Sequence, residues 1–401
     1  MKRRHVLALG AACGLATLPG ARLWAAPSTD APRLLVVFLR GAYDAANLLV
    51  PTSSSFYYEA RPNIAIPKSA ALALDSDWGL APALAESIHP LWLKQQVAFV
   101  PFAGSNDTSR SHFETQDHIE LGQPDDRSPG SRDFRSGFLN RLAGVIGAEQ
   151  PTRSRLEAMA FTDQVPLILR GDRPVANQAL RDLGKPAISA AQAQTIAGMY
   201  AGTRFAGTVS GGFEVRQEVS REMAGEMEAA SRGAIAAKGF ALEARRVARL
   251  MRERVTLGFI DVGGWDTHVG QGGATGQLAN KLGELGKGLA LFADEMGPQW
   301  GNTVVVVVSE FGRTFRENGN RGTDHGHGSA YWVLGGGVKG GRIAGEQQQV
   351  NAATLHQMRD YPVLNEYRAL FGGLFQRMYG LNEAQLAQVF PGASSRDLGL
   401  V

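Results

Sequence analysis

The chain has 401 residues, a length that suits one large domain or two ordinary ones. It is 44% hydrophobic and 20% charged, as is typical of a globular protein. The formal net charge of +3 becomes −1 once the four cations of residues 1–26 are set aside, because those residues carry no acid. The remainder lacks the strong positive charge that nucleic acids attract, so no nucleic-acid partner is expected.

Residues 1–26 are predicted to be an export signal. Lys2-Arg3-Arg4 precedes an apolar stretch from Val6 to Leu18, and Ala25-Ala26 offers a cleavage site. The adjacent arginines are typical of signals read by the twin-arginine export machinery, which predicts a periplasmic or secreted protein. An ordinary secretory signal or a short uncleaved anchor is the alternative. No stable membrane span is expected, because the apolar stretch is shorter than the about 20 residues that a span needs.

The cysteine content limits the metal chemistry. The sequence has one cysteine, Cys13, and it lies inside the predicted signal. The rest of the chain has no thiol, so any metal ion there would be held by His, Asp, Glu or other oxygen ligands.

Short apolar runs predict strands that are buried on both faces. The clearest run is Val304 to Val308, which is β-branched and too short for a membrane helix. Such runs are typical of a mostly parallel α/β sheet covered by helices. The other predicted strands are Leu34 to Leu39, Val97 to Pro101, Val165 to Leu169, Leu257 to Val262 and Ala330 to Leu334.

Helical patterns alternate with these strands. We expect residues 32–401 to form a single domain with a helical insertion around residues 189–254. The predicted helices are Ala81 to Lys94, Gly137 to Ile146, Ser189 to Gly202, Phe213 to Arg254, Leu278 to Met296 and Pro362 to Tyr379.

Acids and imidazoles follow several of the predicted strands. In a parallel sheet, the groups just past the carboxyl ends of the strands share one edge, where ligands bind. Carboxylates with imidazoles are a common ligand mixture for zinc and similar divalent ions. The candidate ligands from this pattern are Asp44, Asp266, His268, Asp324, His325 and His327. Asp44 is alternatively a helix cap, and the loop around His325 is alternatively a hydrogen-bonded surface loop.

A polar loop that follows the second strand offers a candidate nucleophile. A hydroxyl needs a base or a metal ion that lowers its pKa before it attacks. Ser111, or Ser109, beside His112 meets that need. The alternative is a capping box, in which Ser111 and Glu114 begin a helix from Phe113 to Leu121. The sequence leaves both interpretations open.

Six segments resemble the alkaline phosphatase superfamily, and in particular its twin-arginine-exported bacterial branch catalogued as a domain of unknown function. They occur in order and span nearly the whole chain after the predicted signal. The segments are Val36 to Pro51, Ser109 to Asp117, Gly263 to His268, Ser309 to Asn318, Gly322 to Gly328 and Asp360 to Phe375.

The resemblance implies a three-layer α/β/α sandwich with a mostly parallel central sheet and up to two divalent metal ions, zinc above all. Asp266 and His268 match the ligands of one ion, and Glu310 stands where the superfamily usually has an Asp. The sequence departs from the pattern at Phe311, which replaces a usual His ligand. Asp44 resembles the first Asp, Ser111 or else Ser109 the hydroxyl position, and His327 the late His ligand, with Asp324 and His325 near it.

The expected function is that of an exported metal-dependent hydrolase of phosphate or sulfate esters, acting on a small anionic ester or a glycan-linked substrate. Ser111 would be the nucleophile, with His112 beside it. Arg110 or Arg313 would hold the oxygens of the anion bidentately. The alternative is a non-catalytic exported metal- or glycan-binding protein on the same fold, which the replacement at Phe311 favours.

Overall fold

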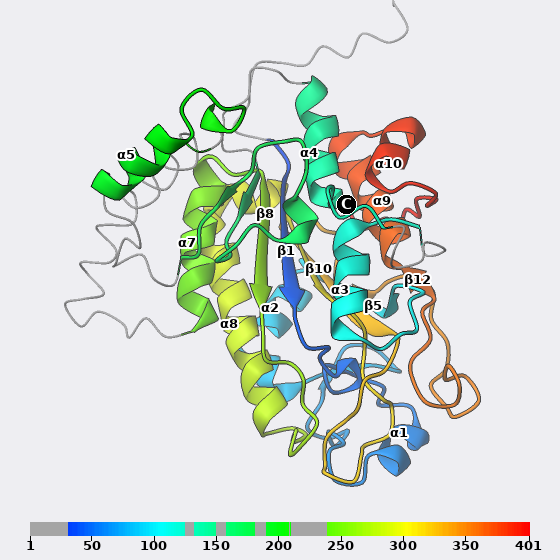
Figure 1. Cartoon of the computed structure of the whole chain (residues 1–401). Helices are drawn as coiled ribbons and strands as arrows, with labels where there is room; N and C mark the ends of the chain where they lie inside the picture. The colour runs from blue at the N-terminus through cyan, green and yellow to red at the C-terminus, as the bar shows by residue number, and fades with distance from the viewer. Residues whose placement is uncertain (1–30, 125–131, 150–157, 181–189, 208, 210–238) are drawn as a thin grey trace, which may run out of the picture.

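The computed structural model describes residues 31–124, 132–149, 158–180, 190–207, 209 and 239–401. Its centre is a nine-stranded sheet in the order β11-β5-β10-β9-β1-β8-β6-β7, with β12 paired to β5 (Figure 1). In chain order these strands are β1 (Arg33–Leu39), β5 (Val97–Gly104), β6 (Ala158–Ala160), β7 (Ala176–Asn177), β8 (Leu257–Val262), β9 (Thr303–Ser309), β10 (Ser329–Leu334), β11 (Arg342–Ile343) and β12 (Asn365–Glu366).

The sheet is mostly parallel, as the apolar runs predicted. β1 pairs in parallel with both β8 and β9, and β10 runs antiparallel to its neighbours β5 and β9. A small antiparallel sheet lies beside the large one. Its strands are β2 (Leu49–Val50), β4 (Gly79–Leu80) and β3 (Leu72–Ala73).

Alternate residues of the central strands enter two separate cores, which makes the fold a three-layer sandwich. In β1, Leu35 and Val37 belong to one core, whereas Leu34 and Val36 belong to the other. Both faces are therefore covered, which explains why the strand is apolar throughout. In Figure 1, α2, α7 and α8 lie on one side of the sheet, and α3, α4, α9 and α10 lie on the other.

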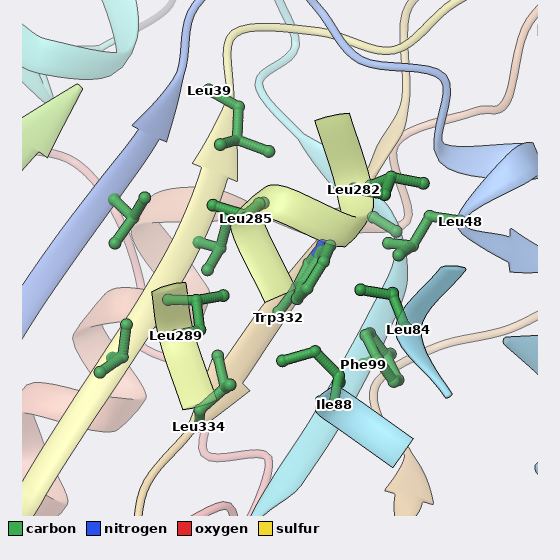
Figure 2. Packing of buried hydrophobic residues seen from close by; sticks show 14 of the residues in the cluster. Leu39, Leu48, Leu84, Ile88, Phe99, Leu282, Leu285, Leu289, Trp332 and Leu334 are labelled. Carbon is green, nitrogen blue, oxygen red and sulfur yellow. The ribbon is translucent and has the colours of Figure 1, made fainter. Parts of the chain in front are cut away.

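The helices bury apolar stripes against these two faces. In α8, Leu282, Leu285 and Leu289 recur at helical spacing and pack toward Leu39 and Trp332 of the sheet (Figure 2). The described helices are α1 (Ser55–Ala60), α2 (Ile88–Leu93), α3 (His112–Leu121), α4 (Phe138–Glu149), α5 (Ala190–Met199), α7 (Phe240–Glu253), α8 (Gln277–Met296), α9 (Tyr367–Tyr379) and α10 (Glu383–Val389). The described residues also form 3₁₀ helices at Ala45–Asn47, Pro82–Leu84, Leu167–Leu169 and Gly297–Asn302.

Three predicted elements differ from the structure. The run from Val165 to Leu169 is a 3₁₀ helix at its end, because Pro166 has no N–H to donate to a strand ladder. The helix predicted from Ala81 to Lys94 is divided into a 3₁₀ turn and α2. The C-terminal helix begins only at Tyr367, because the two residues before it pair with β5.

Two predictions fall on residues that the structure does not describe. The export signal at residues 1–26 lies outside the described residues, as does most of the helix predicted from Phe213 to Arg254, of which α7 is the described part. Among the described helices, none combines the length and the apolar character needed to cross a membrane.

The ends of the parallel strands lie level with one another. Leu39 pairs with Val262 of β8 and with Ser309 of β9, so the loops that follow these three strands leave from one edge of the sheet. The segment that enters β10 arrives at the same edge, because β10 runs in the opposite direction. This topology brings residues that are distant in sequence to one place.

Candidate metal centre

Three side chains from separate segments converge at this edge. His112 is the first residue of α3, Asp266 follows β8, and His325 lies in the loop between β9 and β10. One donor atom from each lies within 4.8 Å of the others. His112 Nε2 is 3.0 Å from His325 Nε2 and 3.6 Å from Asp266 Oδ2. His325 Nε2 is 3.4 Å from Asp266 Oδ1.

These distances fit a common metal ion. Two ligand atoms that are each about 2.1 Å from a tetrahedral ion lie roughly 3.4 Å apart. The separations of 3.0, 3.4 and 3.6 Å lie near that value, and the two from Asp266 end on different oxygens of its carboxylate. The spacing therefore makes these three side chains a candidate metal site.

The hydrogen bonds of the two imidazoles show which nitrogen faces the centre. His325 Nδ1 lies 3.0 Å from the carbonyl oxygen of Arg110, which can only accept, so this nitrogen donates. His112 Nδ1 lies 2.8 Å from Glu310 Oε1 and donates in the same way. When both rings are neutral, the two Nε2 lone pairs face each other at 3.0 Å. A metal ion, or a shared proton, relieves the repulsion between them.

Glu310 is built to hold His112. Its carboxylate is fully buried and accepts from Gly41 N at 2.8 Å and from Gln116 Nε2 at 3.0 Å, besides His112. Burial opposes its ionisation, but the hydrogen bonds from His112 and Gln116 outweigh it and lower its pKa. The same hydrogen bond raises the pKa of His112. The structure thus places Glu310, a predicted ligand, behind the candidate ligand His112, as the acceptor of its Nδ1–H.

Phe311 forms one wall of the centre. Its ring stacks on His112 with the centroids 4.9 Å apart and lies 5.3 Å from the ring of His325. It is buried, so it shields one side of both imidazoles from water. Phe311 replaces a His ligand that the resemblance leads one to expect. In the structure its ring supports the candidate ligands His112 and His325.

Asp266 is fixed by a buried arginine. Arg313 Nη1 lies 2.5 Å from Asp266 Oδ1, and the Arg313 side chain has no exposed surface. Burial opposes the ionisation of Asp266, yet the hydrogen bond and charge of Arg313 lower its pKa overall. Thr323 accepts from the same guanidinium. Arg313, a predicted anion clamp, is therefore engaged with a carboxylate of the protein.

His268 and Asp324 border the centre on its open side. His268 Nε2 is 2.9 Å from Asp266 Oδ1 and 3.1 Å from His325 Nε2. Its Nδ1 is 3.2 Å from Asp324 Oδ1. The side chains of His268 and Asp324 are 38% and 53% exposed, against 21% for His112. His268 is thus a candidate further ligand that solvent reaches.

Two predicted ligands, Asp44 and His327, neither belong to the donor set nor border it, and each has another partner. Asp44 forms a buried ion pair with Arg61 and caps the 3₁₀ helix Ala45–Asn47, the alternative that the sequence had left open. His327 packs its ring against His356, with the centroids 4.8 Å apart. Burial lowers the pKa of His327 to about 4.

The predicted catalytic residues have structural partners. Ser111 is the N-cap of α3, and its Oγ accepts from Glu114 N at 3.5 Å. The guanidinium of Arg110 binds the buried carboxylate of Asp360, with Nη2 2.7 Å from Oδ2. Arg110 has a φ of +54°, a conformation that non-glycine residues rarely adopt, and its carbonyl oxygen lies 3.0 Å from His325 Nδ1.

Arg61 and Asp360 are not among the functional residues that the sequence predicts. Arg61 follows an aromatic stretch with no motif around it, so no signal marked it. Asp360 opens one of the six segments that carry the family resemblance, and that position was a signal that could have identified it.

Comparison with known proteins places the chain in a family. Residues 31–390 match the model described as "Protein of unknown function (DUF1501)". The chain belongs to this DUF1501 family. No curated protein matches it. Among solved structures, it is similar to a protein in the alkaline phosphatase superfamily from Vibrio parahaemolyticus, with 11% identity and a TM-score of 0.33. The match covers 76% of the DUF1501 chain and 60% of that protein.

If the candidate centre of this DUF1501 protein holds zinc, Glu310→Gln is expected to weaken its binding by about 10- to 100-fold, the usual effect of losing an acceptor behind a histidine ligand. The amide carries no charge, so the Nδ1–H of His112 is held less firmly. Zinc affinity is measured by competition with a chromogenic chelator. An unchanged affinity would contradict the role assigned to Glu310.

Proposed function

We propose that this DUF1501 protein is an exported metal-dependent hydrolase of phosphate or sulfate esters. The observation that carries the proposal is the convergence of His112, Asp266 and His325 with donor atoms at metal-like separations. The six sequence segments that resemble the alkaline phosphatase superfamily agree with it.

The residues of the centre divide into ligands and supports. His112, Asp266 and His325 would hold a divalent ion, with zinc the first candidate and His268 beside them. Such an ion, when bound, supplies Lewis acidity for displacement at phosphorus or sulfur. Arg313 keeps Asp266 ionised, because it lowers the pKa of that carboxyl group.

The nucleophile in this proposal is the Ser111 hydroxyl or a water molecule. A hydrogen bond of 3.5 Å from Glu114 N to Ser111 Oγ is at the outer limit for such contacts, so the hydroxyl leaves its cap at little cost. Substrate would approach from the side of His268 and Asp324, where the centre is most exposed. A small anionic ester or the ester group of a glycan fits this open approach.

The test is hydrolysis of 4-nitrophenyl phosphate and 4-nitrophenyl sulfate by zinc-loaded protein. We expect activity that a chelator removes and zinc restores, and that Asp266→Asn loses. Ser111→Ala separates the two nucleophiles, because a covalent route through Ser111 requires its hydroxyl. Native protein that contains no metal, or a rate unaffected by Asp266→Asn, would overturn the proposal.

One observation favours a second candidate, a non-catalytic metal- or glycan-binding protein. The guanidinium groups of Arg110 and Arg313 are engaged with Asp360 and Asp266, so neither is placed to bind the anion of a substrate. If Ser111→Ala behaves as the wild type in every assay and zinc still binds, this candidate replaces the hydrolase.

Export through the twin-arginine machinery is part of the proposal and rests on Lys2-Arg3-Arg4. The test replaces Arg3 and Arg4 together by lysine in the full chain. We expect the protein to stay in the cytoplasm, and normal export of this variant would exclude the route.

A further inference from the structure

We infer that Asp44, a predicted metal ligand, does not hold a metal ion, because the guanidinium of Arg61 permanently occupies the cation position beside it. The inference rests on the metal centre of the proposed function and removes Asp44 from its ligands. It begins from the division of the sequence-predicted ligands, which places Asp44 outside the set formed by His112, Asp266 and His325.

The acceptor sites of Asp44 are all in use. Oδ2 accepts from Arg61 Nη1 at 2.5 Å and from Gln271 Nε2 at 2.6 Å. Oδ1 accepts from Arg61 Nη2 at 3.0 Å and from Ala46 N at 3.2 Å. A carboxylate has about four lone-pair sites, so four N–H donors leave none for a metal ion.

Arg61 is equally saturated. Besides Asp44, its guanidinium donates to Phe315 O at 2.7 Å, to Thr314 O at 3.1 Å and to Asn47 Oδ1 at 3.0 Å. These contacts account for the five N–H groups of an arginine side chain. Its charge also lies 5.6 Å from the ring centroid of Tyr57. A metal ion could reach Asp44 only by displacing the two N–H groups that Arg61 donates to it.

The carboxylate of Asp44 keeps the buried arginine charged. The side chains of Arg61 and Asp44 are 0% and 2% exposed. Burial would lower the pKa of Arg61, but the charge and hydrogen bond of Asp44 outweigh it and raise the pKa. An arginine does not lose its proton in a protein, so the cation beside Asp44 is permanent.

A chain of hydrogen bonds connects this ion pair to the metal centre. Gln271, which donates to Asp44, accepts from Thr323 Oγ1 at 2.9 Å. Thr323 Oγ1 in turn accepts from Arg313 Nε at 3.2 Å, and Arg313 holds Asp266. Asp44 is therefore a positioning residue that acts on Asp266 through three side chains.

The experiment is zinc titration of metal-free full-length protein, with bound zinc counted by elemental analysis after dialysis. We expect one zinc per chain in the wild type and in the double variant Arg61→Met/Asp44→Leu, which replaces the buried pair by apolar side chains. Gln271→Leu breaks the connecting chain without removing the ion pair. It is expected to keep one zinc and to weaken its affinity by about 10-fold or more.

The outcomes are distinguishable. Two zinc ions in the wild type, one of them lost in the double variant, would overturn this inference and leave the metal centre standing. No zinc in the wild type would overturn the proposed function and the inference together. If the double variant does not fold, Gln271→Leu decides, because an unchanged zinc affinity there would overturn the positioning role of Asp44.

Discussion

His325→Ala is expected to abolish tight zinc binding, whereas His327→Ala, two residues further along the same loop, is expected to keep it. His325 Nε2 lies within 3.4 Å of both His112 Nε2 and an oxygen of Asp266. His327 instead packs on His356. Removing a ligand should lower the zinc affinity by more than the roughly 10- to 100-fold that follows removal of an outer contact.

The measurement is the zinc dissociation constant of each variant, by competition with a chelator, together with its far-UV spectrum as a check of folding. His327→Ala is a matched control, since it removes the same ring from the same loop. Equal losses of affinity in the two variants would contradict the assignment of His325 as a zinc ligand. They would show that zinc binding depends on the conformation of the loop and not on the His325 ring.

Arg61→Met is expected to cost about 3–5 kcal/mol of unfolding free energy, the usual effect of leaving one buried charge without its partner. Asp44 is 1% exposed and would retain only Gln271 and a backbone N–H as donors. Part of the loss would come from the contacts of the guanidinium with the carbonyl oxygens of Phe315 and Thr314.

The free energy is measured by urea denaturation of metal-free protein, so that zinc binding does not contribute to stability. Arg316→Met is the control, because Arg316 forms an exposed pair with Glu59 at 3.5 Å. Removing such a pair should cost at most about 1 kcal/mol. A similarly small loss of unfolding free energy in Arg61→Met would contradict this expectation. It would show that water or another cation takes the place of the guanidinium beside Asp44.

The layers of the fold could be predicted from the sequence, because burial on two faces leaves a visible mark. Val304 to Val308 is apolar at every position, and alternate valines enter opposite cores. The direction of β10 left no such mark, since its residues are as apolar as those of a parallel strand. Pro166 was a local signal against a strand, but the apolar residues around it favoured one.

The location of the candidate centre could be predicted from the sequence, but not which residues form its donor set. Strand ends in a parallel sheet converge, so Asp266 and His325 could be expected at one edge. The role of Glu310 depends on its distance to one ring nitrogen of His112, which spacing along the chain does not encode. Asp44 resembles a metal ligand in the sequence because it follows a predicted strand. No motif surrounds Arg61, so the sequence does not show that this arginine pairs with Asp44.

The three donors come from α3, from the loop after β8 and from the loop before β10. A shared ion would fasten these distant segments together, much as a cross-link does, in a polypeptide whose one thiol lies in the predicted signal. Chelation should then loosen the whole rim of the sheet at once. Its loops would become substrates for proteases that the loaded protein resists.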